Sequence, residues 1–287
     1  MTLSLMTRHT YVPCYKLICV IFRSIVIHNI QMRHIKLTIQ YDGTAYSGWQ
    51  VQKEEMTIQG LLEDAIFTVT GEKLRVTGAG RTDAGVHALE QVAAFSTQSD
   101  LMPDVFFRAL NANLPEDIRI VDVEECSANF HPRYGTKNKT YSYLISFYYG
   151  AYAVFLKRYA WQIPCQLNCD SMREAADHLI GRHDFSSFRA SGCSSKNPVR
   201  EVTKIEISEY DSFDFLTFTF NTPVIKISIQ ANAFLRHMAR NIVGTLVEAG
   251  RRRIPPGKMT EILEAKDRCA AGKTAPACGL FLEKINY

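Results

Sequence analysis

The glycine-rich segment Gly78–Ala88 contains the residues of this chain whose types and spacing best suit chemistry. Its glycines permit backbone angles that other residues avoid, and between them Arg81 stands two positions before Asp83. A carboxylate held on a rigid loop beside a guanidinium group stays ionised, which suits a nucleophile or a general base. A tight turn capped by Asp83 fits the pattern equally well. The segment lacks both GK[ST] and G-x-G-x-x-G, so it is not a phosphate-binding loop.

Tyr141 and Tyr143 lie on an expected strand and therefore point to the same face. Lys137 and Lys139 come directly before them. Aromatic rings beside cations form a platform for an unstacked base. Taken alone, the pattern favours a pair of tyrosines packed into the core of a half-buried sheet.

Two groups of arginines follow near the C-terminus. Arg236 and Arg240 are one turn apart on a helix expected over 233–249, off its buried face. Arginines so spaced usually form a solvated face, but they also suit bidentate binding of a carboxylate or of phosphates. Arg251, Arg252 and Arg253 suit a phosphate contact or a charge cluster at the end of that helix.

Two sets of residues resemble metal sites. Cys165, Cys169, His178 and His183 imitate a zinc signature, but the eight residues between the two pairs are fewer than the usual twelve or more. Asp83 and His87 supply two ligands without a third. We therefore expect no bound metal, although a metal-dependent hydrolase that uses Asp83 and His87 remains an alternative.

The elements that must position these residues alternate without a strict βαβ order. The first half is expected to contain strands at 35–41, 74–77, 91–95 and 118–123, a helix from Thr57 to Gly71 and another at 103–110. The second half is expected to contain strands at 141–147, 201–207, 213–220, 225–229 and 280–285, with helices at 170–180, 233–249 and 260–265. This mixture predicts an α+β fold with mainly antiparallel sheets, in two domains, 32–135 and 136–287.

Charge is uneven along the 287 residues, of which 22% are charged. Residues 1–41 hold five basic side chains and no acidic one, whereas the rest holds 28 basic and 29 acidic. A neutral body that binds a polyanion must do so through a local basic cleft. The eleven-residue apolar run 17–27 is too short to span a membrane. We expect residues 1–31 to be an extension before a natural start at Met32, and the eight cysteines to be reduced thiols.

The segment Gly80–His87, G-R-T-D-A-G-V-H, resembles the signature loop of the TruA family of tRNA pseudouridine synthases. The resemblance extends in family order from about Met32 to the C-terminus. It includes the segments Tyr41–Gln50, Asn111–Pro115, Phe130–Arg133, Lys139–Tyr143, Asp184–Phe188 and Arg240–Gly244. It implies two α+β domains around a basic catalytic cleft in a cytoplasmic homodimer that needs neither cofactor nor metal. The implied partner is the anticodon stem-loop of tRNA, at positions 38, 39 and 40.

The resemblance also implies roles for single residues. Asp83 takes the place of the essential aspartate, Tyr141 that of the tyrosine stacked on the target base, and Arg81 and Arg240 those of two arginines of the site. Lys137, Lys139, Arg236 and Arg251–Arg253 are expected to contact RNA. Whether Asp83 attacks the sugar or removes a sugar proton stays open, as does whether Tyr141 or a water accepts the proton from C5. A catalytically silent RNA-binding module remains the alternative from another class.

Overall fold

The computed structural model describes residues 32–147, 153–215, 218–220 and 223–287. The chain divides into the units 1–32 and 33–287, and the fold below is that of the second. The expected N-terminal extension, with its apolar run, lies outside the described residues. None of the helices in the described ranges is both long and apolar enough to cross a membrane.

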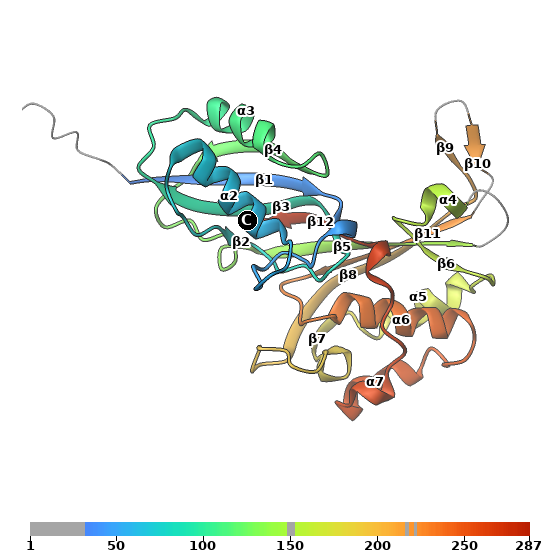
Figure 1. The fold of residues 1–287 in the computed structure, drawn as a ribbon. Helices are drawn as coiled ribbons and strands as arrows, with labels where there is room; N and C mark the ends of the chain where they lie inside the picture. The colour runs from blue at the N-terminus through green and yellow to red at the C-terminus, as the bar shows by residue number, and fades with distance from the viewer. Residues whose placement is uncertain (1–31, 148–152, 216–217, 221–222) are drawn as a thin grey trace, which may run out of the picture. The chain divides into compact units, whose positions relative to one another are not determined.

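One ten-stranded sheet runs through both halves of the sequence (Figure 1). Eight of its strands follow the order β4-β1-β3-β12-β5-β11-β8-β7, and the other two, β2 and β6, pair with β3 and β5. The first half supplies β1 (Arg33–Tyr41), β3 (His87–Thr97) and β4 (Ile118–Glu125), with the short β2 (Thr77–Gly78) paired to β3. These strands pair antiparallel. In β1 every second residue is buried, which is the alternation that predicted the strand.

The second half supplies the remaining strands of this sheet. They are β5 (Asn138–Phe147), β6 (Trp161–Ile163), β7 (Gly181–Asp184), β8 (Val199–Tyr210), β11 (Val224–Ala231) and β12 (Leu280–Asn286). The last strand, β12, lies between β3 and β5, parallel to the first and antiparallel to the second. The α+β fold with mainly antiparallel pairing is thereby confirmed. The division at 135/136 stays a prediction, and the two halves share the sheet.

The helices pack in two groups. In the first half, α2 (Ile58–Thr70) contacts α3 (Pro103–Asn113), which contacts β4. In the second half, α5 (Cys169–Asp177) contacts α6 (Met238–Gly250), and α7 (Lys258–Ala265) follows; α4 (Ala153–Leu156) is a single turn. The predicted ends of α2 are confirmed, because Thr57 accepts a hydrogen bond from the amide of Gly60 and Gly71 adopts a φ of 73°.

Three predicted elements differ from the structure. Of the strand expected at 74–77, only Thr77 lies in a strand. The segment expected as one strand at 213–220 forms two short paired strands, β9 (Phe213–Phe215) and β10 (Phe218–Phe220). The helix expected from Ala233 begins only at Met238, because His237 before it has a φ of 62°, which no α-helix accommodates. Hydrophobic spacing does not register such a break in the backbone.

Candidate active site

The loop between β2 and β3 is held rigidly by its surroundings. The Thr82 hydroxyl lies 2.8 Å from the Tyr41 hydroxyl, and the Thr82 carbonyl accepts a 3.1 Å hydrogen bond from the Trp49 amide. At Gly78 a Cβ would lie 2.6 Å from the Trp49 indole, so only glycine fits there. Gly85 has a φ of 75°, which glycine adopts without strain. The predicted need for glycine therefore holds at these two positions.

Asp83 projects from this loop toward the start of α6. Its Oδ2 lies 3.2 Å from Arg240 Nη1, which donates a hydrogen bond to it, and 3.4 Å from His237 Nε2. The Arg240 Nε donates to the Ala275 carbonyl at 2.8 Å, which fixes the guanidinium in place. The side chains of Asp83 and Arg240 are only 28% and 15% exposed. These contacts orient the carboxylate, and Oδ1 has no partner among the described residues.

His237 is a site residue that the sequence analysis missed. Burial lowers the pKa of its imidazole, as do the charges of Arg240, Arg236 and Arg268, while Asp83 opposes them. Its left-handed backbone turns the ring toward Asp83 at the point where α6 begins. Such backbone strain is concentrated at functional sites. Local spacing gave no sound signal for it, because His237 precedes α6 and has a left-handed backbone that sequence periodicity does not reveal.

Tyr141 forms another wall of the site. It lies on β5, is 7% exposed, and packs at 4.8 Å edge-on against the ring of Phe234. Burial raises the pKa of its phenol, and the nearby Tyr41 and Asp83 raise it further. Tyr143, two positions on, is fully buried, and its hydroxyl donates to the Pro276 carbonyl. Tyr141 thus lines the cavity, whereas Tyr143 is packed in the core.

Lys139 is buried rather than displayed on the surface. Its Nζ donates a 2.5 Å hydrogen bond to the Ala79 carbonyl, just before the Asp83 loop. Burial lowers the pKa of its ammonium group to about 8, and the charge of Arg133 adds to this effect. Lys139, for which an RNA contact is predicted, therefore also connects β5 to the chain just before the Asp83 loop.

Asp83, Tyr141 and Lys139 all line one cavity of about 1190 Å³. Its cationic side chains are Arg75, Arg81, Arg133, Lys139, Arg200, Arg236 and Arg240, and its carboxylates are Asp83 and Glu55. Cations therefore outnumber carboxylates here, although the body of the chain is neutral. The cavity has the charge that a polyanion requires.

The structure does not bring every predicted residue to Asp83. Arg81 is exposed at the cavity wall and has no side-chain hydrogen bond or ion pair within the described parts of the chain. Arg236 also lines the cavity and is exposed, but it precedes α6 and so is not one helical turn from Arg240. The prediction that Arg236 and Arg240 lie one turn apart on the same helix is therefore wrong, because the backbone turns at His237. Lys137 is exposed and outside the cavity lining.

The arginine triplet lies at the opposite end of α6 from Asp83. A helix of 13 residues is about 20 Å long, which separates the two sites. Arg251 and Arg253 both pair with Glu248, at 2.8 Å and 3.2 Å, and Arg252 is exposed with a φ of 59°. Of the two interpretations, this arrangement favours the charge cluster at a helix end. A role in RNA binding stays a prediction.

Two of the histidines that imitate metal ligands have other partners. His87 Nδ1 accepts a hydrogen bond from the Gly43 amide at 3.1 Å, and its Nε2 faces the carbonyls of Arg158 and Cys278. His178 Nδ1 contacts the Thr260 hydroxyl. Among the residues that the structure describes, no group of three or more His, Cys, Asp or Glu is placed to hold a metal ion.

Comparison with known proteins agrees with the family resemblance of the sequence. The tRNA pseudouridine synthase family model matches residues 37–135 and 175–287, more than half of the chain. The chain is 44% identical over 256 residues to tRNA pseudouridine synthase A of Caldicellulosiruptor saccharolyticus, covering 89% of this chain and 100% of that protein. It is 43% identical over 257 residues to tRNA pseudouridine synthase A of Acetivibrio thermocellus, with the same coverage of both chains. The chain therefore belongs to the tRNA pseudouridine synthase family and is an isomerase.

Proposed function

We propose that this protein converts uridine to pseudouridine at positions 38, 39 and 40 in the anticodon stem-loop of tRNA. Asp83 is its catalytic carboxylate, and it uses no cofactor. The observation that carries the proposal is the pairing of Asp83 with Arg240 and His237 in a cation-lined cavity that also contains Tyr141. The three tRNA positions, the cytoplasmic location and a homodimeric assembly follow from the family resemblance alone.

The reaction breaks the N1–C1′ bond, turns the detached uracil and forms a C5–C1′ bond, while one proton leaves C5 and one is gained at N1. Asp83 starts the sequence either by attacking C1′ or by removing a sugar proton. Arg240 and His237 both contact Oδ2, which leaves Oδ1 as the oxygen presented to the ribose. Fixed partners of this kind keep the carboxylate aimed in a partly buried site.

Tyr141 is the surface against which the extruded base stacks. Removing a base from the helical stack costs a few kcal/mol, and contact with an aromatic face offsets part of this cost. Because its pKa is raised, the phenol stays protonated at neutral pH. The edge-on packing of its ring against Phe234 holds it in place for stacking, and Tyr141 or a water accepts the proton from C5.

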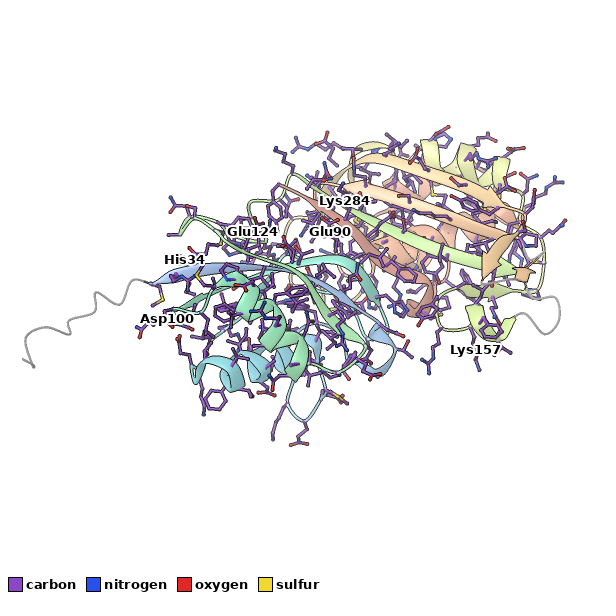
Figure 2. All side chains as sticks on the ribbon, turned by 90° about the horizontal axis from the view of Figure 1, so that it is seen from above. His34, Glu90, Asp100, Glu124, Lys157 and Lys284 are labelled. Atoms are coloured by element: carbon purple, nitrogen blue, oxygen red, sulfur yellow. The ribbon has the colours of Figure 1, made fainter. Side chains whose placement is uncertain are left out.

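The test is to incubate the purified protein with unmodified tRNA transcript and to map pseudouridine chemically. We expect Asp83→Asn to abolish product while largely keeping tRNA affinity, because binding requires no carboxylate facing a polyanion. The matched control is Asp100→Asn, an exposed aspartate in the loop between β3 and α3 that should keep full activity (Figure 2).

Four results would contradict the proposal. Undiminished turnover by Asp83→Asn would refute the mechanism, and product formed only at other uridines would refute the substrate positions. Tight tRNA binding by the wild-type protein without any product would indicate the silent binding module. Activity that is lost in excess chelator and restored by metal would favour the metal-dependent alternative.

A further inference from the structure

A second cavity, of about 380 Å³, lies beside the active site. Its walls are the segment 186–193 and the residues that follow α7. The side chains and backbone that line it belong to Ser186, Arg189, Ala190, Ser191, Gly192, Cys193, Lys266 and Arg268. Three of these residues are cationic, two carry a hydroxyl group, and none is acidic. This lining is chemically selective for an anion.

The motif Asp184–Phe188 contributes Ser186 to the lining of this cavity, and its Asp184 contacts two of the lining residues from behind. Asp184 Oδ1 accepts a 2.9 Å hydrogen bond from the Ser186 amide, and Asp184 Oδ2 lies 3.6 Å from Lys266 Nζ. Burial raises the pKa of Asp184, but the Ser186 hydrogen bonds and the Lys266 charge outweigh it, so the pKa lies below its usual value. The Asp184 carboxylate thus orients Lys266, and the three cations outnumber this one carboxylate by two.

Asn241, in the first turn of α6, connects this cavity to that helix through hydrogen bonds. Its Oδ1 accepts a 3.1 Å hydrogen bond from Arg268 Nη2, and its Nδ2 donates to the Phe188 carbonyl at 2.8 Å. Asn241 is 1% exposed and directly follows Arg240, the partner of Asp83. The position of the second cavity is therefore fixed relative to the reacting carboxylate by the first turn of α6.

The two cavities share part of their lining. Gly192 and Cys193 border both of them. The Ala190 amide donates a 3.0 Å hydrogen bond to the Arg236 carbonyl, which attaches the shared segment to the chain just before α6. The second cavity therefore adjoins the active-site cavity along this shared segment.

We propose that this second cavity binds a backbone phosphate of the substrate RNA next to the uridine held at Asp83. The inference rests on the proposed function, in which the substrate is a polynucleotide. Arg189 and Lys266 contribute the adaptable charges, and Arg268, held by Asn241, contributes a fixed one. Phosphate contacts of this kind set the register of RNA on a protein without reading its sequence.

The test is the salt dependence of tRNA affinity in the double variant Arg189→Gln/Lys266→Asn. Asparagine suits position 266, because Lys266 has a φ of 50° and asparagine tolerates that region. The variant should neutralise one phosphate fewer than the wild type and therefore bind tRNA more weakly. The slope of the logarithm of the association constant against the logarithm of the salt concentration should become less steep by about 0.7–0.9. The loss should be larger in KM than in kcat.

Lys258→Gln is the matched control. Lys258 is an exposed cation at the other end of α7, it lines neither cavity, and its loss should change neither affinity nor slope. Thermal unfolding checks that each variant is folded, and the single changes Arg189→Gln and Lys266→Asn repeat the test if the double variant is not.

Two outcomes would overturn the proposal. In the first, affinity and slope are unchanged in a folded variant. In the second, wild-type protein binds inorganic phosphate in the second cavity while the variant keeps full tRNA affinity, so the cavity takes free anions only. A wild-type protein that binds tRNA with the expected slopes but forms no pseudouridine would refute the proposed function instead.

Discussion

Removal of the Arg240 guanidinium tests how much the ion pair with Asp83 contributes to catalysis. At the observed 3.2 Å, two unit charges attract by about 1.3 kcal/mol in bulk water and by about 5 kcal/mol at an effective dielectric constant of 20. With side chains 28% and 15% exposed, the pair lies between these limits, near 2–3 kcal/mol. At about 1.4 kcal/mol for each factor of ten, Arg240→Ala should slow the reaction about 30- to 150-fold.

The assay is a single-turnover measurement with saturating tRNA, because the pair orients a reacting group and its loss should affect the chemical step. Arg240→Lys should recover only part of the rate. A lysine supplies the charge, but it cannot contact Asp83 and the Ala275 carbonyl with the planar geometry that Arg240 uses.

A second measurement tests whether Arg240 and Asp83 interact directly. In a double-mutant cycle with Asp83→Asn, the unfolding free energies should show a favourable coupling between the two positions. Turnover by folded Arg240→Ala within about threefold of wild type, or a coupling energy of zero, would refute the view that this pair holds Asp83.

The other predictions concern the cavity and its supports. Tyr141→Phe should keep more activity than Tyr141→Ala in the same turnover assay, since stacking needs the ring; equal losses would indicate that the hydroxyl acts in catalysis. The pKa of Lys139 is lowered to about 8 in the folded protein, so between about pH 8 and 10 the unfolded chain binds more protons at this position. The free energy of unfolding should therefore rise with pH in this range, by up to about 1.4 kcal/mol per pH unit relative to Lys139→Met. Parallel denaturation curves at each pH for the two proteins would contradict this. Gly244→Ala should destabilise the fold strongly, because the new Cβ would lie 1.7 Å from the Lys273 carbonyl oxygen. Gly257→Ala is the control, because its Cβ would meet nothing within 4 Å. Equal melting temperatures of these two variants would refute the predicted clash.

The local elements were predictable because their signals are local. The alternation in β1 and the cap residues at both ends of α2 specify these elements without help from distant contacts. The start of α6 was not predictable in this way. Its apolar spacing continues through Leu235, but the backbone at His237 is left-handed and delays the helix to Met238, which apolar spacing does not register.

Residue types and their order in the sequence determined the α+β class, the family resemblance and the identity of Asp83, Tyr141 and Arg240 as candidates. Tertiary structure decided which of them meet. It placed Arg240 and His237 on the same oxygen of Asp83, and it left Arg81 without a partner in the described part of the chain. The physical reason is distance: Asp83 and Arg240 are 157 positions apart in the chain, and only the packing of α6 beside the glycine loop brings their charges within 3.2 Å.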